Sequence, residues 1–143
     1  MTLVIADVNC LKLTNDVFGH PTGDRLLRKA ACIIKKECRV DDIIARIGGD
    51  EFVILLPRTS YEQAGLIVQR INRAIAAQKK GPLNLSISFG WATKQEPRED
   101  ITAIFKKADD SIYRSKLSEN LLLQHETIVT IINNLYEKNE REQ

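Results

Sequence analysis

The chain has 143 residues, 43% of them hydrophobic and 28% charged, which is the balance of one globular domain with a sizeable core. Its 21 basic and 19 acidic side chains give a net charge of +2, too small to indicate binding to nucleic acid or to a membrane surface. No apolar run reaches the length of a transmembrane helix, and the three cysteines (Cys10, Cys32 and Cys38) lack metal-site spacing. We therefore expect a cytoplasmic location with reduced thiols, although a parent protein could be membrane-anchored.

The chain opens on a strand and continues into a helix. Residues 3–7 (LVIAD) form an apolar run that predicts a buried strand, and its abrupt start suggests a chain cut at its N-terminus. Over residues 23–38, apolar side chains return at the spacing of one helical face: Leu26, Leu27, Ala30, Ile33 and Ile34. This pattern predicts an amphipathic helix.

A hairpin is predicted next. Residues 42–47 (DIIARI) and 52–56 (FVILL) are short, rich in isoleucine and valine, and end at Pro57, which is typical of paired strands. The turn between them is Gly48-Gly49-Asp50-Glu51. A turn explains the glycines, because glycine adopts positive φ without steric cost, but it does not explain two adjacent carboxylates. A solvated loop whose acids serve solubility is the plain alternative.

Two helices and a strand complete the predicted core. Thr59 and Glu62 have the spacing of a capping box, which predicts the start of a helix. That helix presents one apolar face: Ala64, Ile67, Val68, Ile71 and Ile75. Residues 85–89 (LSISF) alternate as in a half-buried strand, and residues 100–117 predict a last helix. Its inward positions are Ile101, Ile104, Phe105, Ala108 and Ile112.

The predicted order β-α-β-β-α-β-α belongs to the α+β class. Its first six elements form the split βαβ, or ferredoxin-like, arrangement, in which the strand order is 4-1-3-2. In that arrangement the first strand lies antiparallel to the third, so the end of one meets the start of the other. We therefore expect Asp7 to lie beside Asp50, within a domain that spans residues 1–117.

The composition changes from Glu119 onward. Four apolar residues form a heptad-like stripe: Leu121, Ile128, Ile132 and Leu135. The stripe predicts a helix of roughly 20 residues with charges elsewhere. Residues 118–143 are thus a helical tail that packs on its own domain, or a connector to another domain, and the pattern leaves both interpretations open.

Two carboxylates that meet at a sheet edge beside a glycine-rich turn have the layout of a divalent-metal site. Hard oxygen ligands suit Mg²⁺ or Mn²⁺, and Mg²⁺ usually completes its shell with water and substrate phosphate. Gly48 and Gly49 would let a phosphate come close to backbone N–H groups. Asp7 and Asp50 are therefore candidate metal ligands.

Longer motifs extend this interpretation. From Asp7 to Asp24 the chain reads Asp-x-Asn-x-x-Lys-x-x-Asn-Asp-x-x-Gly-His-x-x-Gly-Asp, residues 46–52 read RIGGDEF, and residues 106–116 read KKADDSIYRSK. On these motifs, residues 3–117 resemble the GGDEF family, the diguanylate cyclases. The resemblance implies a ferredoxin-like core related to the polymerase palm.

The resemblance implies an enzyme that joins two GTP molecules into cyclic di-GMP and releases two pyrophosphates. It implies metal ligation by Asp7, Asp50 and the carbonyl of Val8. It places Glu51 near the attacking 3′-hydroxyl and Lys12 against a phosphate. Phosphoryl-type transfer depends mainly on positioning and charge neutralisation, which these groups can supply.

The resemblance also implies a GTP site. Further phosphate contacts would be Lys116 and the amides of Cys10 and Leu11. Asn15 and Asp24 would read guanine, while His20 lies in the matching Gly-His pair, where a structural role is equally open. Guanine offers N1–H and N2–H₂ donors to a carboxylate at Asp24, whereas adenine lacks the N1–H, so GTP is expected over ATP.

A second motif lies upstream of the turn. Arg39-Val40-Asp41-Asp42 matches RxxD, which in the GGDEF family is an inhibitory site for the product. Arg70, on the following helix, lies where a secondary arginine of that site can lie. Arginine can stack on guanine and bind phosphate with two donors. The alternative is an ordinary charged strand entry at Arg39 and Asp42, and a solvated helix face at Arg70.

Three departures from the family pattern stand out. Asn9 replaces the second aspartate of the first motif, and Ser118-Glu119-Asn120 replaces Gly-Arg-Asn, so an arginine expected to help hold phosphate is missing. The opening helix ahead of the first strand is absent.

Residues 127–143 (TIVTIINNLYEKNEREQ) resemble the entry helix of an HD-GYP or related HD-type domain.

We therefore expect a diguanylate cyclase that needs a homodimer, because two domains must each present one GTP, and we expect this piece by itself to be only weakly active. The first alternative is a module that binds GTP or cyclic di-GMP and signals without catalysis. The second is an interaction domain that only regulates a C-terminal neighbour. No nucleic acid partner and no direct membrane contact are expected.

Overall fold

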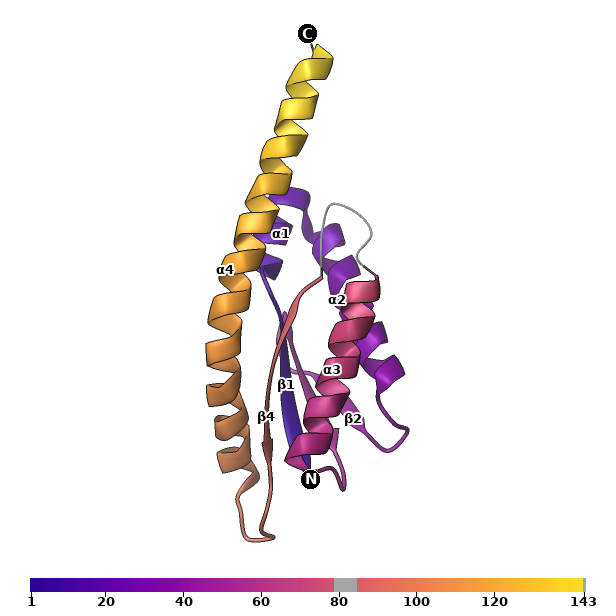
Figure 1. The fold of residues 1–143 in the computed structure, drawn as a ribbon, viewed down its shortest axis with the longest axis vertical. Helices are drawn as coiled ribbons and strands as arrows, with labels where there is room; N and C mark the ends of the chain where they lie inside the picture. The colour runs from indigo at the N-terminus through magenta and orange to yellow at the C-terminus, as the bar shows by residue number, and fades with distance from the viewer. Residues whose placement is uncertain (79–84, 143) are drawn as a thin grey trace.

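A computed structural model describes residues 1–78 and 85–142. These residues form four strands and four helices, drawn in Figure 1. In chain order they are β1 (Thr2–Val8), α1 (Leu11–Phe18), α2 (His20–Glu37), β2 (Ile43–Arg46), β3 (Glu51–Leu56), α3 (Tyr61–Ala77), β4 (Ile87–Thr93) and α4 (Ile101–Glu142). The α+β class is confirmed.

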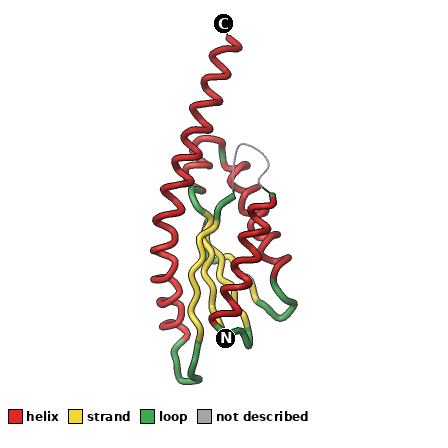
Figure 2. The backbone as a smooth tube through the Cα atoms, in the orientation of Figure 1, coloured by secondary structure: helices red, strands yellow, loops and turns green. Residues whose placement is uncertain are grey.

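The four strands form one antiparallel sheet in the order β2-β3-β1-β4, which confirms the predicted order. Figure 2 shows the strands together at the centre of the molecule, between helices. In β1, Asp7 lies opposite Glu51 of β3 on one side and opposite Ser88 of β4 on the other. The register therefore places the end of β1, which carries Asp7, against the start of β3, which carries Glu51.

Helices cover both faces of the sheet, and β1 lies between them (Figure 1). Val4, Ala6 and Val8 point into the core shared with α2 and α3, whereas Leu3 and Ile5 point into the core shared with α4. Each of the valine, leucine and isoleucine side chains contributes roughly 1.5–3 kcal/mol when fully buried. A strand buried on both faces needs a continuous apolar run, which is what residues 3–6 supply.

Glycine at position 90 permits the close packing of α4 on β4. A Cβ at Gly90 would lie 2.4 Å from the carbonyl oxygen of Ala108 and 2.4 Å from the backbone nitrogen of Ile112. Real Cβ atoms do not approach backbone so closely, so α4 could not reach this position over a larger residue. The helix that carries residues 106–116 is thereby held close against the sheet.

The structure differs from the predicted elements in the segment after β1. The helix predicted over residues 23–38 begins at His20, and the separate helix α1 precedes it. Cys10 adopts a left-handed conformation (φ 58°) at the start of α1, and Gly19 (φ 91°) separates the two helices. α1 was not predicted because it is short and buries only Leu11 and Thr14, too few positions for a periodic pattern.

Two further boundaries were predicted wrongly. The capping box of α3 uses Ser60 and Gln63 rather than Thr59 and Glu62, because Thr59 is buried and its carbonyl accepts a hydrogen bond from Thr2. The last strand spans Ile87–Thr93 rather than residues 85–89, and it is buried on both faces over its first four residues. Leu85 is buried before the strand begins.

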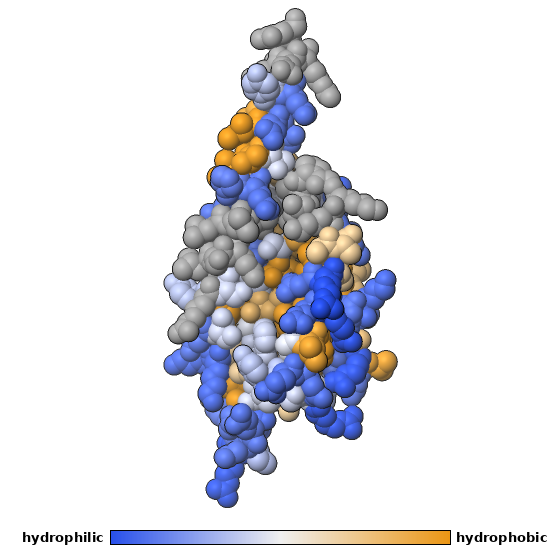
Figure 3. Space-filling model, viewed as in Figure 1, coloured by the Kyte–Doolittle hydropathy of each residue, from blue (hydrophilic) through white to orange (hydrophobic). Residues whose placement is uncertain are grey.

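α4 continues without a break past residue 117, and its C-terminal part projects beyond the sheet (Figure 1). Ile128, Ile132 and Leu135 are 49%, 57% and 58% exposed, so these side chains do not pack on the chain's own core. Figure 3 shows apolar side chains on this projecting end. The side chain of Leu121, the fourth residue of the predicted stripe, lies outside the described part. None of the described helices has an apolar stretch long enough to cross a bilayer.

Candidate functional site

The candidate site begins where β1 ends and β3 begins. The backbone N–H of Val8 donates to the carbonyl of Asp50 at 2.8 Å, and Asp7 lies directly opposite Glu51. Asp7 is 7% exposed, and Asp50 and Glu51 are half-buried. The sheet thus brings Asp7 to the turn, as expected, with Glu51 as its direct cross-strand neighbour and Asp50 opposite Val8.

The donor set at this strand end suits a hard divalent cation. Among the described residues, no group of three or more His, Cys, Asp or Glu side chains is arranged to hold a metal ion. The available donors are instead the carboxylates of Asp7 and Asp50 and the carbonyl of Val8. Such a partial set fits Mg²⁺ or Mn²⁺ bound with water and substrate phosphate, and like charges opposed across a strand pair favour a cation between them.

A tight turn leads from β1 into α1. Cys10 occupies the N-cap position in the left-handed region, and its own side chain does not cap the first turn of α1. A non-glycine residue held in this region costs free energy and is often found at a ligand site. Burial raises the pKa of the Cys10 thiol, so it stays protonated and adds no negative charge there. Lys12 is exposed in the first turn of α1.

Asn15 and Asp24, the two residues predicted to bind guanine, lie on either side of the contact between α1 and α2. A Cβ at Gly23 would lie 1.8 Å from Oδ1 of Asn15, so Asn15 packs directly on α2 beside Asp24. Oδ1 of Asn15 is buried and has no hydrogen-bond partner within the described part of the chain. Asp24 is exposed and lines a pocket of about 310 Å³ with Arg46 and other residues: Leu27, Arg28, Ala31 and Phe52.

His20 and Lys116 remain undecided by geometry. His20 is the exposed first residue of α2, directly after Gly19. Lys116 lies on α4, but its side chain is outside the described part of the structure. Their predicted roles stay predictions.

The glycines of the turn lack the positive φ that the sequence suggested for them, while the close approach of a phosphate stays a prediction. Neither Gly48 nor Gly49 has a left-handed φ, so the turn itself does not require glycine there. A Cβ at Gly49 would meet no described atom within 4 Å, and one at Gly48 would come only within 3.8 Å of Glu51. The surface above these glycines is therefore open to an approaching ligand.

Sequence reasoning gave no role to Arg46 or Asn9. Arg46 donates from Nε to the carbonyl of Gly48 at 3.0 Å and from Nη2 to the carbonyl of Gly49 at 2.8 Å. Asn9 is 2% exposed and bonds both Ser86 (2.9 Å) and Ser88 (3.0 Å), which ties the end of β1 to β4. The sequence signal for Arg46 was its position two residues before the glycine pair. The signal for Asn9 was that it replaces an aspartate of the family motif.

The RxxD segment forms a compact structure between α2 and β2. The backbone N–H of Arg39 donates to Oδ2 of Asp42 at 2.7 Å, and the Arg39 guanidinium donates to Oγ1 of Thr59 at 2.7 Å. The Asp42 side chain is 0% exposed, and its Oδ1 has no hydrogen-bond partner among the residues that the structure describes. Burial, followed by the nearby Asp42 carboxylate, raises the pKa of the Cys38 thiol to about 11, so Cys38 stays neutral.

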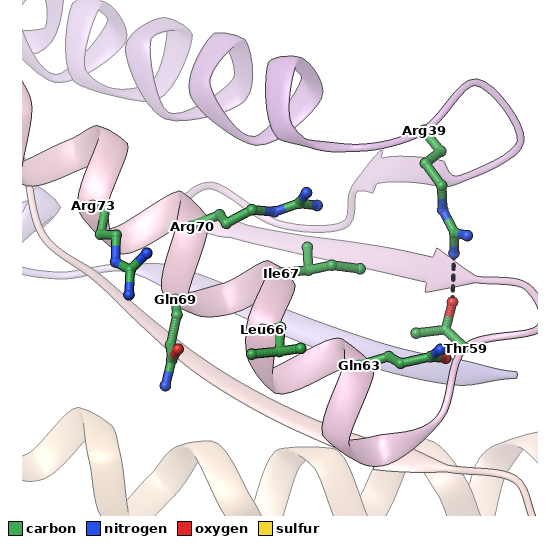
Figure 4. Close-up of a pocket in the computed structure, with 8 residues that line it drawn as sticks. All are labelled: Arg39, Thr59, Gln63, Leu66, Ile67, Gln69, Arg70 and Arg73. Carbon is green, nitrogen blue, oxygen red and sulfur yellow. Dashed lines mark hydrogen bonds between the residues drawn. The ribbon is translucent and has the colours of Figure 1, made fainter.

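Two pockets meet at Arg39. One, of about 500 Å³, runs along α3 and is lined by Arg39, Thr59, Gln63, Leu66, Ile67, Gln69, Arg70 and Arg73 (Figure 4). The other, of about 620 Å³, includes Arg39, Asp42 and Arg46. Arg70 donates to the carbonyl of Glu37 at 3.3 Å. The predicted trio Arg39, Asp42 and Arg70 is therefore divided between two pockets that share Arg39.

Comparison with known proteins identifies the family of this chain. Residues 1–120 match the family model described as diguanylate cyclase, GGDEF domain. The chain belongs to the GGDEF family. Over 120 residues it is 41% identical to diguanylate cyclase DgcP of Pseudomonas aeruginosa, and this match covers 81% of this chain and 18% of that protein.

Other GGDEF proteins are similar in sequence and in structure. The response regulator PleD of Caulobacter vibrioides is 32% identical over 124 residues, 82% of this chain and 27% of that protein. The active GGEEF domain of a diguanylate cyclase from Vibrio cholerae superposes with a TM-score of 0.73 at 26% identity, covering 82% of this chain and 76% of that one. The GGDEF domain of DgcB from Caulobacter crescentus, in complex with c-di-GMP, gives 0.74 at 26% identity, with 82% and 72% covered. The chain spans less than a third of either curated relative.

Proposed function

We propose that this domain is one half of a diguanylate cyclase, which condenses two GTP molecules into cyclic di-GMP in a metal-dependent reaction. The observation that carries the proposal is the opposition of Asp7 and Glu51, with Asp50 hydrogen-bonded beside Val8. Three carboxylates at one strand end are unfavourable by themselves, and a divalent cation held there would offset their repulsion.

The chain's own residues hold and orient the nucleotide. Asp7, Asp50 and the carbonyl of Val8 would hold Mg²⁺ or Mn²⁺. When bound, the metal neutralises charge on the phosphates and lowers the pKa of the attacking hydroxyl. Glu51 orients the 3′-hydroxyl or accepts its proton. Each transfer forms a bond from the 3′-oxygen of one GTP to the α-phosphorus of the other, and breaks the bond to the departing pyrophosphate.

Different residues bind the phosphates and the base. Lys12, Lys116 and the amides of Cys10 and Leu11 contact the phosphates, and the left-handed Cys10 aims the start of α1 at them. Asn15 and Asp24 bind the guanine edge. The buried Oδ1 of Asn15, unpaired within the described part of the chain, supports this role, because a base donor would satisfy it.

The second pocket system supports product binding. We assign Arg39, Asp42 and Arg70 to a regulatory site for cyclic di-GMP, the ligand with which the similar GGDEF domain of DgcB forms a complex. Oδ1 of Asp42 has no hydrogen-bond partner among the described residues. The pocket along α3 is also lined by Arg73, and none of its described lining residues is acidic. Guanidinium groups bind phosphate and stack on bases.

One observation favours a second function. Asn120 and its neighbours replace the arginine-bearing motif that the family carries after its last helix motif. A module that binds GTP or cyclic di-GMP and regulates a neighbouring domain without turnover is therefore the alternative.

A single assay separates the two functions. The chain is fused at its N-terminus to a parallel coiled coil through an added helix, and incubated with GTP and Mg²⁺. Cyclic di-GMP and pyrophosphate in a 1:2 ratio are expected for a cyclase that condenses two GTP into one product. Nucleotide binding without either product would establish the binding module and reject the cyclase.

A further inference from the structure

Arg46, the last residue of β2, holds both glycines of the turn. Its Nε donates to the carbonyl of Gly48 at 3.0 Å and its Nη2 to the carbonyl of Gly49 at 2.8 Å. A guanidinium presents its donors in one rigid plane, so a single side chain fixes two successive carbonyls. Both peptide groups are thereby turned with their oxygens toward Arg46.

The orientation of these peptides determines where two N–H groups point. All described peptide bonds are trans, and in a trans peptide the N–H points away from the C=O. The N–H groups of Gly49 and Asp50 therefore point away from Arg46. No backbone acceptor among the described residues is bonded to either one. Two successive N–H groups that face outward form a concavity that binds anions.

Space is available around Gly49. A Cβ at Gly49 would meet no described atom within 4 Å, and neither glycine has a left-handed φ that would explain its presence. The carbonyl of Asp50 is fixed on Val8 at 2.8 Å, so the two N–H groups lie next to the metal ligands. Arg46 also lines the pocket that contains Asp24. The turn is thus placed between the proposed base site and the proposed metal site.

We propose that Arg46 is a positioning residue that orients the N–H groups of Gly49 and Asp50 to bind a phosphate oxygen of the nucleotide. Arg46 acts through the carbonyls it holds and does not itself contact the phosphate. This inference rests on the proposed nucleotide-binding function.

The test compares a ligand with phosphates and a ligand without them. Arg46→Gln, Arg46→Lys and the matched control Arg25→Gln, which removes an exposed arginine of α2 near Asp24, are titrated with guanosine and with a GTP analogue carrying a non-hydrolysable α,β bridge. Arg46→Gln should bind the analogue about tenfold more weakly, the factor expected for one charge-assisted hydrogen bond, and bind guanosine as the wild type does. A general loss of structure would weaken both.

Arg46→Lys distinguishes positioning from direct charge pairing. Lysine keeps the charge but cannot hold two carbonyls in one plane, so it should behave like Arg46→Gln. Full recovery of analogue affinity in Arg46→Lys would overturn the proposal, because it would make Arg46 a phosphate contact. An equal loss in Arg25→Gln would overturn it as well, because the effect would then be one of net charge.

Amide NMR shifts separate failure of this inference from failure of the proposed function. In the wild type, adding the analogue should shift the resonances of Gly49 and Asp50 as well as those of Asn15 and Asp24. Shifts at Asn15 and Asp24 alone would overturn the role of the turn and leave nucleotide binding intact. No shift at any of the four would reject the proposed function itself, and this inference with it.

Discussion

Asn15 of α1 rests directly against Gly23 of α2, so closely that a Cβ at position 23 would lie 1.8 Å from Oδ1 and 2.8 Å from Cγ of Asn15. The contact sets the position of the carboxamide relative to Asp24, the next residue of α2. It links the helix that follows β1 to the helix that presents the second guanine contact.

Gly23→Ala should therefore displace Asn15 and weaken GTP binding. We expect about a tenfold loss of affinity for a GTP analogue, the worth of one hydrogen bond to a buried group, with a fold that still unfolds cooperatively. Calorimetric titration measures the affinity, and thermal unfolding checks the fold. Gly65→Ala in α3 is the control, since its Cβ would only touch the Trp91 ring at 3.4 Å. Unchanged affinity in Gly23→Ala would contradict the role of Asn15.

Removing a carboxylate at the strand end should remove the response to metal. In the wild type, Mn²⁺ together with a GTP analogue should raise the unfolding temperature, because a ligand that binds only the folded state stabilises it. Asp7→Asn and Asp50→Asn should lose this rise, and in a tethered dimer Asp50→Asn should form no cyclic di-GMP. Asp16→Asn changes an exposed carboxylate of α1 and should retain the response. Parent-like turnover by Asp50→Asn would refute the metal assignment.

Arg39→Ala should weaken cyclic di-GMP binding away from the active site. The substitution removes a guanidinium that both pockets share and that is held on Thr59 at 2.7 Å. With the active site filled by a GTP analogue, titration calorimetry should show a loss of about tenfold or more. Arg58→Ala removes an exposed arginine that pairs with Asp41 at 3.3 Å and serves as the control. Equal affinities of wild type and Arg39→Ala would rule out this site.

Gly90→Ala should loosen α4 from the sheet. The added Cβ would meet backbone atoms of Ala108 and Ile112 at 2.4 Å, and backbone cannot move aside as a flexible side chain can. We expect a loss of about 3 kcal/mol or more in the free energy of unfolding, measured in urea. Lys116 lies on the same helix, so nucleotide affinity should fall as well. A stability within about 1 kcal/mol of wild type would show that α4 tolerates a shift.

The untethered chain should be a poor cyclase whose rate rises with the square of its concentration. Each domain presents one GTP, and two must face each other for reaction. Tethering raises the effective concentration of the second domain to roughly millimolar, so fusion to an N-terminal parallel coiled coil should raise turnover strongly at low protein concentration. The exposed stripe of Ile128, Ile132 and Leu135 does not by itself orient the turns toward each other. A high rate per molecule that is independent of concentration would contradict this expectation.

The sequence by itself determined the sheet and the family. The apolar runs and the turn residues between them predicted the strands. A strand buried on both faces must be continuously apolar, and the two strands of a hairpin must be separated by turn residues. The antiparallel pairing of the first and third strands then brought Asp7 to the Asp50 turn without any structure. The motif from Asp7 to Asp24 implied the family, and the match over residues 1–120 confirmed it.

Only the tertiary structure decided what depends on contacts between distant segments. α1 has too few buried positions to show a helical period in the sequence. The N-cap of α3 is Ser60 rather than Thr59, because Thr59 is hydrogen-bonded to Thr2 and Arg39. The glycines of the turn proved not to have the positive φ that their sequence suggested. Arg46 became recognisable only through its two carbonyl contacts, because hydrogen-bond geometry depends on the fold and not on residue order.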